Sequence, residues 1–175
     1  MTSVSFDDAI PIINERAENL RKSIFSAADI NLELTNDYLI KNWLDESAIT
    51  VVFGDSNSGT SFFAVDLAYH VASGKNWFGN RVKAGQVLYI AAEGGRGFNK
   101  RIAAIKNNKP DLHEAGCKNL MLLPVQIDLH GAEDVEAIKD QTNKRDYDLL
   151  VIDTLAMSIG EGSENDGRDM GMFLT

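Results

Sequence analysis

The fold of this chain is decided by residues 48–61, which read Ala48-Ile-Thr-Val-Val-Phe-Gly-Asp-Ser-Asn-Ser-Gly-Thr-Ser61. A β-branched apolar run ends at Gly54, and an apolar pattern with helical spacing follows Ser61. A strand, a glycine-bounded loop and a helix together form the context in which a phosphate-binding loop (P-loop) occurs. The spacing of Gly54, Gly59 and Ser61 fits G-x-x-x-x-G-K-[ST], except that Thr60 stands at the lysine position.

Apolar runs and helical patterns alternate along the chain. They predict strands over residues 49–53, 86–92, 119–123 and 148–152, and helices over residues 6–28, 61–73, 98–107 and 132–143. This alternation indicates an α/β fold with a mainly parallel sheet flanked by helices. We interpret residues 1–47 as a helical lead-in packed on the core and residues 48–175 as the P-loop domain. The glycine-rich tail, residues 158–175, reads as a mobile loop followed by the start of a helix near 170–174.

The loop has the residues that a phosphate cradle needs. Glycines let backbone N–H groups converge on phosphate oxygens, and the following helix adds the positive end of its dipole. The candidate nucleotide-binding residues are Gly54, Asn57, Ser58, Gly59, Thr60 and Ser61. The alternative is an ordinary strand-to-helix turn with no ligand.

Two carboxylates follow apolar strands and suit the chemistry of a bound nucleotide. Asp153 ends the run over residues 149–152, and Glu93 follows the run over residues 86–92. Parallel strands bring their carboxyl ends to one edge of the sheet, where ligands bind in open α/β folds. The Ser61 hydroxyl and the Asp153 carboxylate would hold Mg²⁺, and Glu93 would orient or deprotonate a water. Asp153 can equally be a carboxylate that caps a turn.

The composition excludes several classes of protein. The 175 residues include 17 Lys+Arg and 26 Asp+Glu, a formal charge of −9 that opposes direct binding to nucleic acid. Cys117 is the lone cysteine, so no internal disulfide can form. No apolar run approaches the roughly 18 residues that span a bilayer. We therefore expect a single soluble domain in the cytoplasm, without a membrane partner.

Aromatic and basic residues outside the loop have ordinary interpretations. Trp43, Trp77 and Phe78 could stack a nucleotide base, but packing is the preferred interpretation. Lys100 and Arg101 lie in a basic helix, which we interpret as a solvated face rather than a nucleic-acid site.

Three phrases carry a resemblance to a known family: residues 52–67, residues 86–101, which include Tyr89-Ile-Ala-Ala-Glu-Gly, and residues 149–160. They resemble RecA-like P-loop ATPases of the plasmid RepA hexameric helicase type, relatives of which are common in phages. The resemblance covers roughly residues 40–175. It implies that the loop binds ATP, that Ser61 and Asp153 bind Mg²⁺, and that Glu93 is the catalytic carboxylate.

The chain departs from that family in two ways. Thr60 replaces the Walker A lysine, which would bring a positive charge to the phosphates and stabilise the transferred group. We therefore expect ATP and Mg²⁺ to bind weakly or not at all, unless Lys75, Lys83 or Lys100 reaches the loop. Family members also continue with further strands, one of which lies between the P-loop strand and the Asp153 strand. A chain ending at Thr175 would form a core lacking these C-terminal strands.

These features lead to one functional hypothesis and two alternatives. The hypothesis is an ATPase-defective RecA-like protein from a phage or mobile element, which acts by binding a protein partner in replication, recombination or host defence. The first alternative is an active ATP-hydrolysing module of a RepA-like helicase or recombination motor. The second is a structural subunit that binds no nucleotide. Assembly of the chain as a homo-oligomer is compatible with all three.

Overall fold

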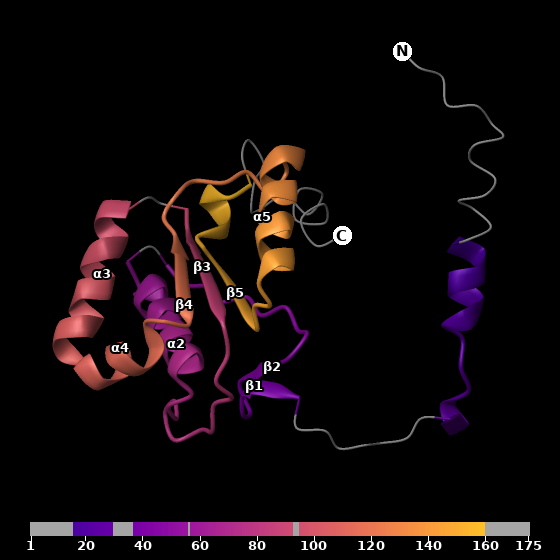
Figure 1. Cartoon of the computed structure of the whole chain (residues 1–175), viewed down its shortest axis with the longest axis horizontal. Coiled ribbons are helices and arrows are strands. Elements are labelled where there is room, and N and C mark those ends of the chain that lie inside the picture. The colour runs from indigo at the N-terminus through magenta and orange to yellow at the C-terminus, as the bar shows by residue number, and fades with distance from the viewer. Residues whose placement is uncertain (1–15, 30–36, 56, 93–94, 160–175) are drawn as a thin grey trace, which may run out of the picture. The chain divides into compact units, whose positions relative to one another are not determined.

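The computed structural model describes residues 16–29, 37–55, 57–92 and 95–159, coloured in Figure 1. The chain forms two compact units, Met1–Asn36 and Asp37–Thr175. In the first unit residues 16–22 are helical, and the 3-10 helix η1 spans Ala27–Asp29. Residues 6–15 of the helix predicted over residues 6–28 lie outside the described residues. The helix predicted near 170–174 also lies outside them.

A three-stranded parallel sheet forms the centre of the second unit (Figure 1). Its strands are β3 (Val87–Ala91), β4 (Leu120–Leu123) and β5 (Leu149–Asp153), in the order β4-β3-β5. All five residues of β3 are buried, as expected of a central strand covered on both faces. The predicted α/β fold with a parallel sheet flanked by helices is therefore confirmed.

Among the described residues, four α-helices accompany the sheet: α2 (Thr60–Ser73), α3 (Gly95–Asn108), α4 (Pro110–Gly116) and α5 (Ala132–Lys144). α2 ends at Gly74, whose φ of 68° is the left-handed conformation that terminates many helices. α4 was not predicted, since no helix was expected between residues 107 and 132. A proline is tolerated in the first turn of a helix, and here it begins one. No described helix has the length and apolarity needed to cross a membrane.

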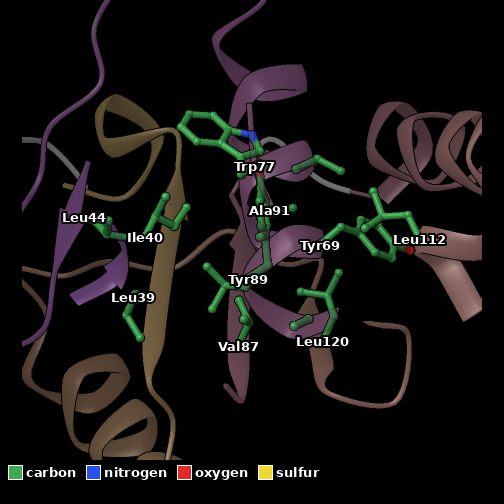
Figure 2. Packing of buried hydrophobic residues seen from close by; sticks show 14 of the residues in the cluster. Leu39, Ile40, Leu44, Tyr69, Trp77, Val87, Tyr89, Ala91, Leu112 and Leu120 are labelled. Atoms are coloured by element: carbon green, nitrogen blue, oxygen red, sulfur yellow. The ribbon is translucent and has the colours of Figure 1, made fainter. Parts of the chain in front are cut away.

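The buried apolar residues form one cluster on each face of the sheet. Successive side chains of a strand point to opposite faces, so alternate residues of β3 contribute to each cluster. Tyr89 and Ala91 belong to the larger cluster, together with buried residues of α2 (Figure 2). Leu88 and Ile90 belong to the smaller cluster, against which Ile138 of α5 packs. The sheet is thus held between α2 and α5.

Part of the lead-in predicted to be helical is instead a β-hairpin. β1 (Tyr38–Ile40) and β2 (Leu44–Asp45) pair antiparallel, and Asn42 between them has a left-handed φ of 66°. Ile40 also bridges to Val82 and is fully buried, so this hairpin belongs to the core of the second unit. The interpretation of residues 1–47 as a helical lead-in therefore does not hold for residues 38–45, which pair as two strands.

Trp77 anchors the aromatic side chains of this region. It is 1% exposed, and its indole N–H donates to Asp66 Oδ2 at 3.1 Å. The rings of Trp43, Phe63 and Phe78 each meet it edge to face. Packing is thus confirmed for Trp77, while Trp43 and Phe78 remain 58% and 80% exposed.

The strand predicted over residues 49–53 does not form. These residues have no strand conformation, and Phe53 is 91% exposed, with Ile49 at 73% and Val51 at 65%. Within the described residues β5 pairs only with β3, so no strand is present that could link residues 49–53 to the sheet. A β-branched run needs a neighbouring ladder to become a strand, because strand propensity is mostly packing against neighbours.

Because residues 49–53 are exposed, we expect substitutions among them to change the free energy of unfolding very little. Phe53→Ala is expected to change the free energy of unfolding by less than about 0.5 kcal/mol, because an exposed side chain loses little burial. Phe98→Ala serves as the matched control, since Phe98 is 1% exposed and truncating a buried phenylalanine costs about 3–5 kcal/mol. Urea denaturation of both variants measures the difference. Equal losses would show that residues 49–53 are packed after all.

Candidate functional site

The loop that follows this run folds back over the start of α2. Ser58 N–H donates to Asp55 C=O at 2.9 Å, and Phe63 N–H donates to Gly59 C=O at 3.0 Å as the helix begins. Gly59 has a φ of 93°, which favours glycine, and Asn57 takes the left-handed region at 67°. Among the described residues no side chain caps the first turn of α2, and N–H groups at a helix start can bind an anion.

Gly54 lies close to the side chains of Ser58 and Thr60. A Cβ placed on Gly54 would lie 2.6 Å from Ser58 Oγ and 3.3 Å from the Thr60 methyl carbon. With a larger residue at this position, the exposed Ser58 side chain would have to turn aside and Thr60 would have to shift by a few tenths of an ångström. Close packing is therefore one reason for a glycine at this position of the loop, although the strand expected before it is absent.

The two residues predicted to bind Mg²⁺ lie in contact. Ser61 Oγ, in the first turn of α2, donates a hydrogen bond to Asp153 Oδ1 at 2.9 Å. Asp153 is the last residue of β5 and is 8% exposed. This contact joins two points that are 92 residues apart in the sequence, and it places a hydroxyl and a carboxylate oxygen together at the carboxyl edge of the sheet.

This pair suits Mg²⁺ better than a metal held by protein alone. No group of three or more His, Cys, Asp or Glu side chains that could hold a metal occurs among the described residues. Mg²⁺ commonly takes one or two protein oxygens and fills its other positions with water and substrate phosphates. Ser61 and Asp153 therefore fit a metal that arrives with a nucleotide.

Tyr89 is a residue of the site that the sequence analysis missed. Its hydroxyl donates to Asp153 Oδ2 at 2.6 Å, and the side chain is fully buried. In the β3–β5 register Tyr89 pairs with Val151, and Ala91 pairs with Asp153. Tyr89 is therefore a diagonal neighbour of Asp153 on the same face, within reach of an aromatic side chain. The signal was available: a polar aromatic residue inside an otherwise apolar strand, two residues before its end.

Glu93, the predicted catalytic carboxylate, lies outside the described residues, between Ala92 and Gly95. The last residue of the strand before it, Ala91, is opposite Asp153 in the register of β3 and β5.

Thr60 is the first residue of α2 and is partly buried. Two of the lysines that could have replaced the missing charge are engaged elsewhere. Lys75 lies beyond the far end of the 14-residue helix, where its ammonium donates to Asp111 C=O at 2.8 Å; the two ends of such a helix are about 21 Å apart. Lys83 pairs with Glu46, and this hydrogen bond raises the pKa of Lys83.

A different cation lies near the loop. The Arg101 guanidinium carbon, on α3, is 5.7 Å from the centre of the Phe62 ring, in the first turn of α2. This contact is of the cation–π type. Lys100, its neighbour in the sequence, is exposed. Arg101 is therefore the cation to test in place of the missing lysine.

The fold and the site together define a class of protein. A glycine loop closed over an uncapped helix start, with a hydroxyl–carboxylate pair at the carboxyl edge of a parallel sheet, is the arrangement of P-loop nucleotide-binding domains. The chain belongs to a family of P-loop ATPases, because a family profile described as an AAA domain matches residues 15–175. No curated protein matches the chain. The family makes ATP with Mg²⁺ the expected ligand of the site.

Proposed function

We propose that this chain is a P-loop domain that binds Mg²⁺–nucleotide weakly, hydrolyses it hardly at all, and acts by binding a protein partner. The observation that carries the proposal is the state of the loop. Its glycine geometry and its Ser61–Asp153 pair are intact, whereas Thr60 occupies the position of the catalytic cation.

Holding a nucleotide and cleaving it make different demands on the site. Backbone N–H groups at a helix start and a hydroxyl–carboxylate pair for Mg²⁺ can hold phosphates without a lysine. Cleavage additionally needs a charge on the β- and γ-phosphates as the transferred group separates. Loss of one preorganised donor costs about 10²–10³ in turnover in a well-studied enzyme site. An ammonium contributes at least as much, so slow hydrolysis follows.

Exposed apolar side chains support the proposal that the chain binds a protein partner. Residues 49–53 present Val51 and Phe53 to solvent, and Trp43 lies with them along one apolar groove, also lined by Phe63 and Leu67. Contiguous exposed apolar surface is typical of protein-binding sites. The acidic net charge of −9 argues against direct nucleic-acid binding. From the resemblance to RepA-type proteins, we propose that the partner belongs to replication, recombination or defence machinery of a phage, mobile element or host.

One observation favours a second function, an active ATPase module of a helicase-like motor. Arg101 lies against Phe62 beside the loop, and a guanidinium is always charged and well suited to phosphate. If Arg101 turned toward the phosphates, it would replace the missing lysine.

Calorimetric titration with ATP and Mg²⁺, followed by an assay of hydrolysis with and without single-stranded DNA, tests the two functions. The proposal predicts detectable binding and no turnover above background. Turnover that disappears in Arg101→Ala, but persists in the control Lys100→Ala, would replace the proposal with the active module. Absence of binding at millimolar ATP would leave the structural subunit as the function.

A further inference from the structure

The Asp153 carboxylate is held at both of its oxygens. Ser61 Oγ donates to Oδ1 at 2.9 Å, and the Tyr89 hydroxyl donates to Oδ2 at 2.6 Å. The two donors come from different elements, α2 and β3, and meet on a carboxylate at the end of β5. An aspartate carboxylate rotates broadly about its last torsion when nothing holds it. Here two hydrogen bonds select one orientation.

The two donors are not equivalent. A serine hydroxyl has one proton and two lone pairs. Ser61 can therefore offer an oxygen lone pair to a cation while its O–H continues to donate a hydrogen bond to Oδ1. Tyr89 is fully buried in the strand core, where its ring meets Phe98 of α3 at 4.9 Å between centroids. Tyr89 is thus placed to hold Oδ2 and not to meet the ligand.

We propose that Tyr89 is the positioning residue of the Mg²⁺ site, and that it fixes the Asp153 carboxylate in the orientation that presents Oδ1 and Ser61 to the metal. The inference rests on the proposed nucleotide-binding function. Residues that orient a metal ligand by a hydrogen bond commonly contribute 10-fold to 100-fold to metal affinity or activity. A purely structural role, in which Tyr89 only satisfies a buried carboxylate, predicts no effect specific to the metal.

Tyr89→Phe removes the hydroxyl and keeps the ring packed on Phe98. The measured quantity is the metal gain, the ratio of the dissociation constant for ATP in EDTA to that in Mg²⁺. We expect Tyr89→Phe to lower the metal gain by about 10-fold to 100-fold and to leave the affinity in EDTA within about two-fold. Circular dichroism confirms that each variant is folded at the temperature used.

The matched control is Tyr69→Phe. Tyr69 is also buried, at 1% exposed, and its hydroxyl is hydrogen-bonded to His113 Nδ1 at 2.8 Å. Burial raises the pKa of Tyr69, with a smaller contribution from Cys117, so the Tyr69 hydroxyl stays protonated at neutral pH. It lies on α2 nine residues from Thr60, about 13 Å along the helix axis. We expect Tyr69→Phe to leave the metal gain unchanged.

Both tyrosine variants are made in the wild-type chain and in Thr60→Lys, which we expect to bind ATP more tightly. An unchanged metal gain in Tyr89→Phe, or equal losses of affinity with and without Mg²⁺, would overturn the positioning role. If the wild-type chain fails to bind but Thr60→Lys binds and loses its metal gain with Tyr89→Phe, the proposed function fails and the role of Tyr89 is supported. If neither chain binds, both proposals fall.

Discussion

Thr60→Lys is expected to raise the affinity for Mg²⁺–ATP by about 10-fold to 100-fold, because a hydrogen bond to a charged group contributes about 1.5–3 kcal/mol. Turnover is expected to rise by about 10²–10³, the effect of one preorganised donor on a transition state. Thr60 is only partly buried, so part of a longer side chain can extend toward solvent. Calorimetry and a phosphate-release assay measure the two effects.

The control for this change is Thr60→Val, which keeps the branched shape and adds no charge. We expect it to match the wild type in both assays. If Thr60→Lys also matched the wild type, the loop would not be a phosphate cradle, because an ammonium at its centre would then meet no phosphate. If it gained binding but no turnover, the defect in hydrolysis would lie outside Thr60.

Asp153→Asn is expected to abolish the difference between ATP binding with and without Mg²⁺. The neutral amide removes the negative charge that attracts the cation, and it cannot accept from both Ser61 and Tyr89 through two carboxylate oxygens. Titrations in Mg²⁺ and in EDTA measure this difference. The same change leaves a buried polar group without a suitable hydrogen-bond partner. We therefore also expect the free energy of unfolding to fall by about 1–3 kcal/mol.

Asp66→Asn provides the comparison. Asp66 is also a carboxylate with two donors, Trp77 Nε1 and Lys109 Nζ, and it lies six residues after Thr60, near the middle of α2. We expect it to leave the Mg²⁺ dependence intact. A Mg²⁺ effect that survived in Asp153→Asn would place the metal elsewhere and contradict the site.

Much of the fold could be predicted from the sequence because its signals are local. β3 and β5 are nearly continuous apolar runs, and α2 has apolar residues at helical spacing that end at Gly74. Gly74 takes the left-handed conformation expected at a helix end. The proximity of Ser61 and Asp153 could also be predicted, since parallel strands end at a common edge and the loop leads into a helix at that edge.

What could not be predicted depends on partners distant in the sequence. Residues 49–53 have the composition of a strand, yet whether they pair is decided by the strand next to them, which local sequence does not reveal. The hairpin of β1 and β2 was missed because its burial comes from contact with Val82, over 35 residues away. Tyr89 stands out in the sequence as a polar aromatic residue in an apolar strand, but its partner, Asp153, is identified only by the register of β3 against β5.

The central claim is that the loop keeps its glycine geometry and its metal pair but lacks the charge that drives cleavage. The most direct test is phosphate release from saturating Mg²⁺–ATP by the wild-type chain, measured beside Glu93→Gln. We predict that the two release phosphate at the same background rate. Release by the wild type that Glu93→Gln removes would contradict the claim.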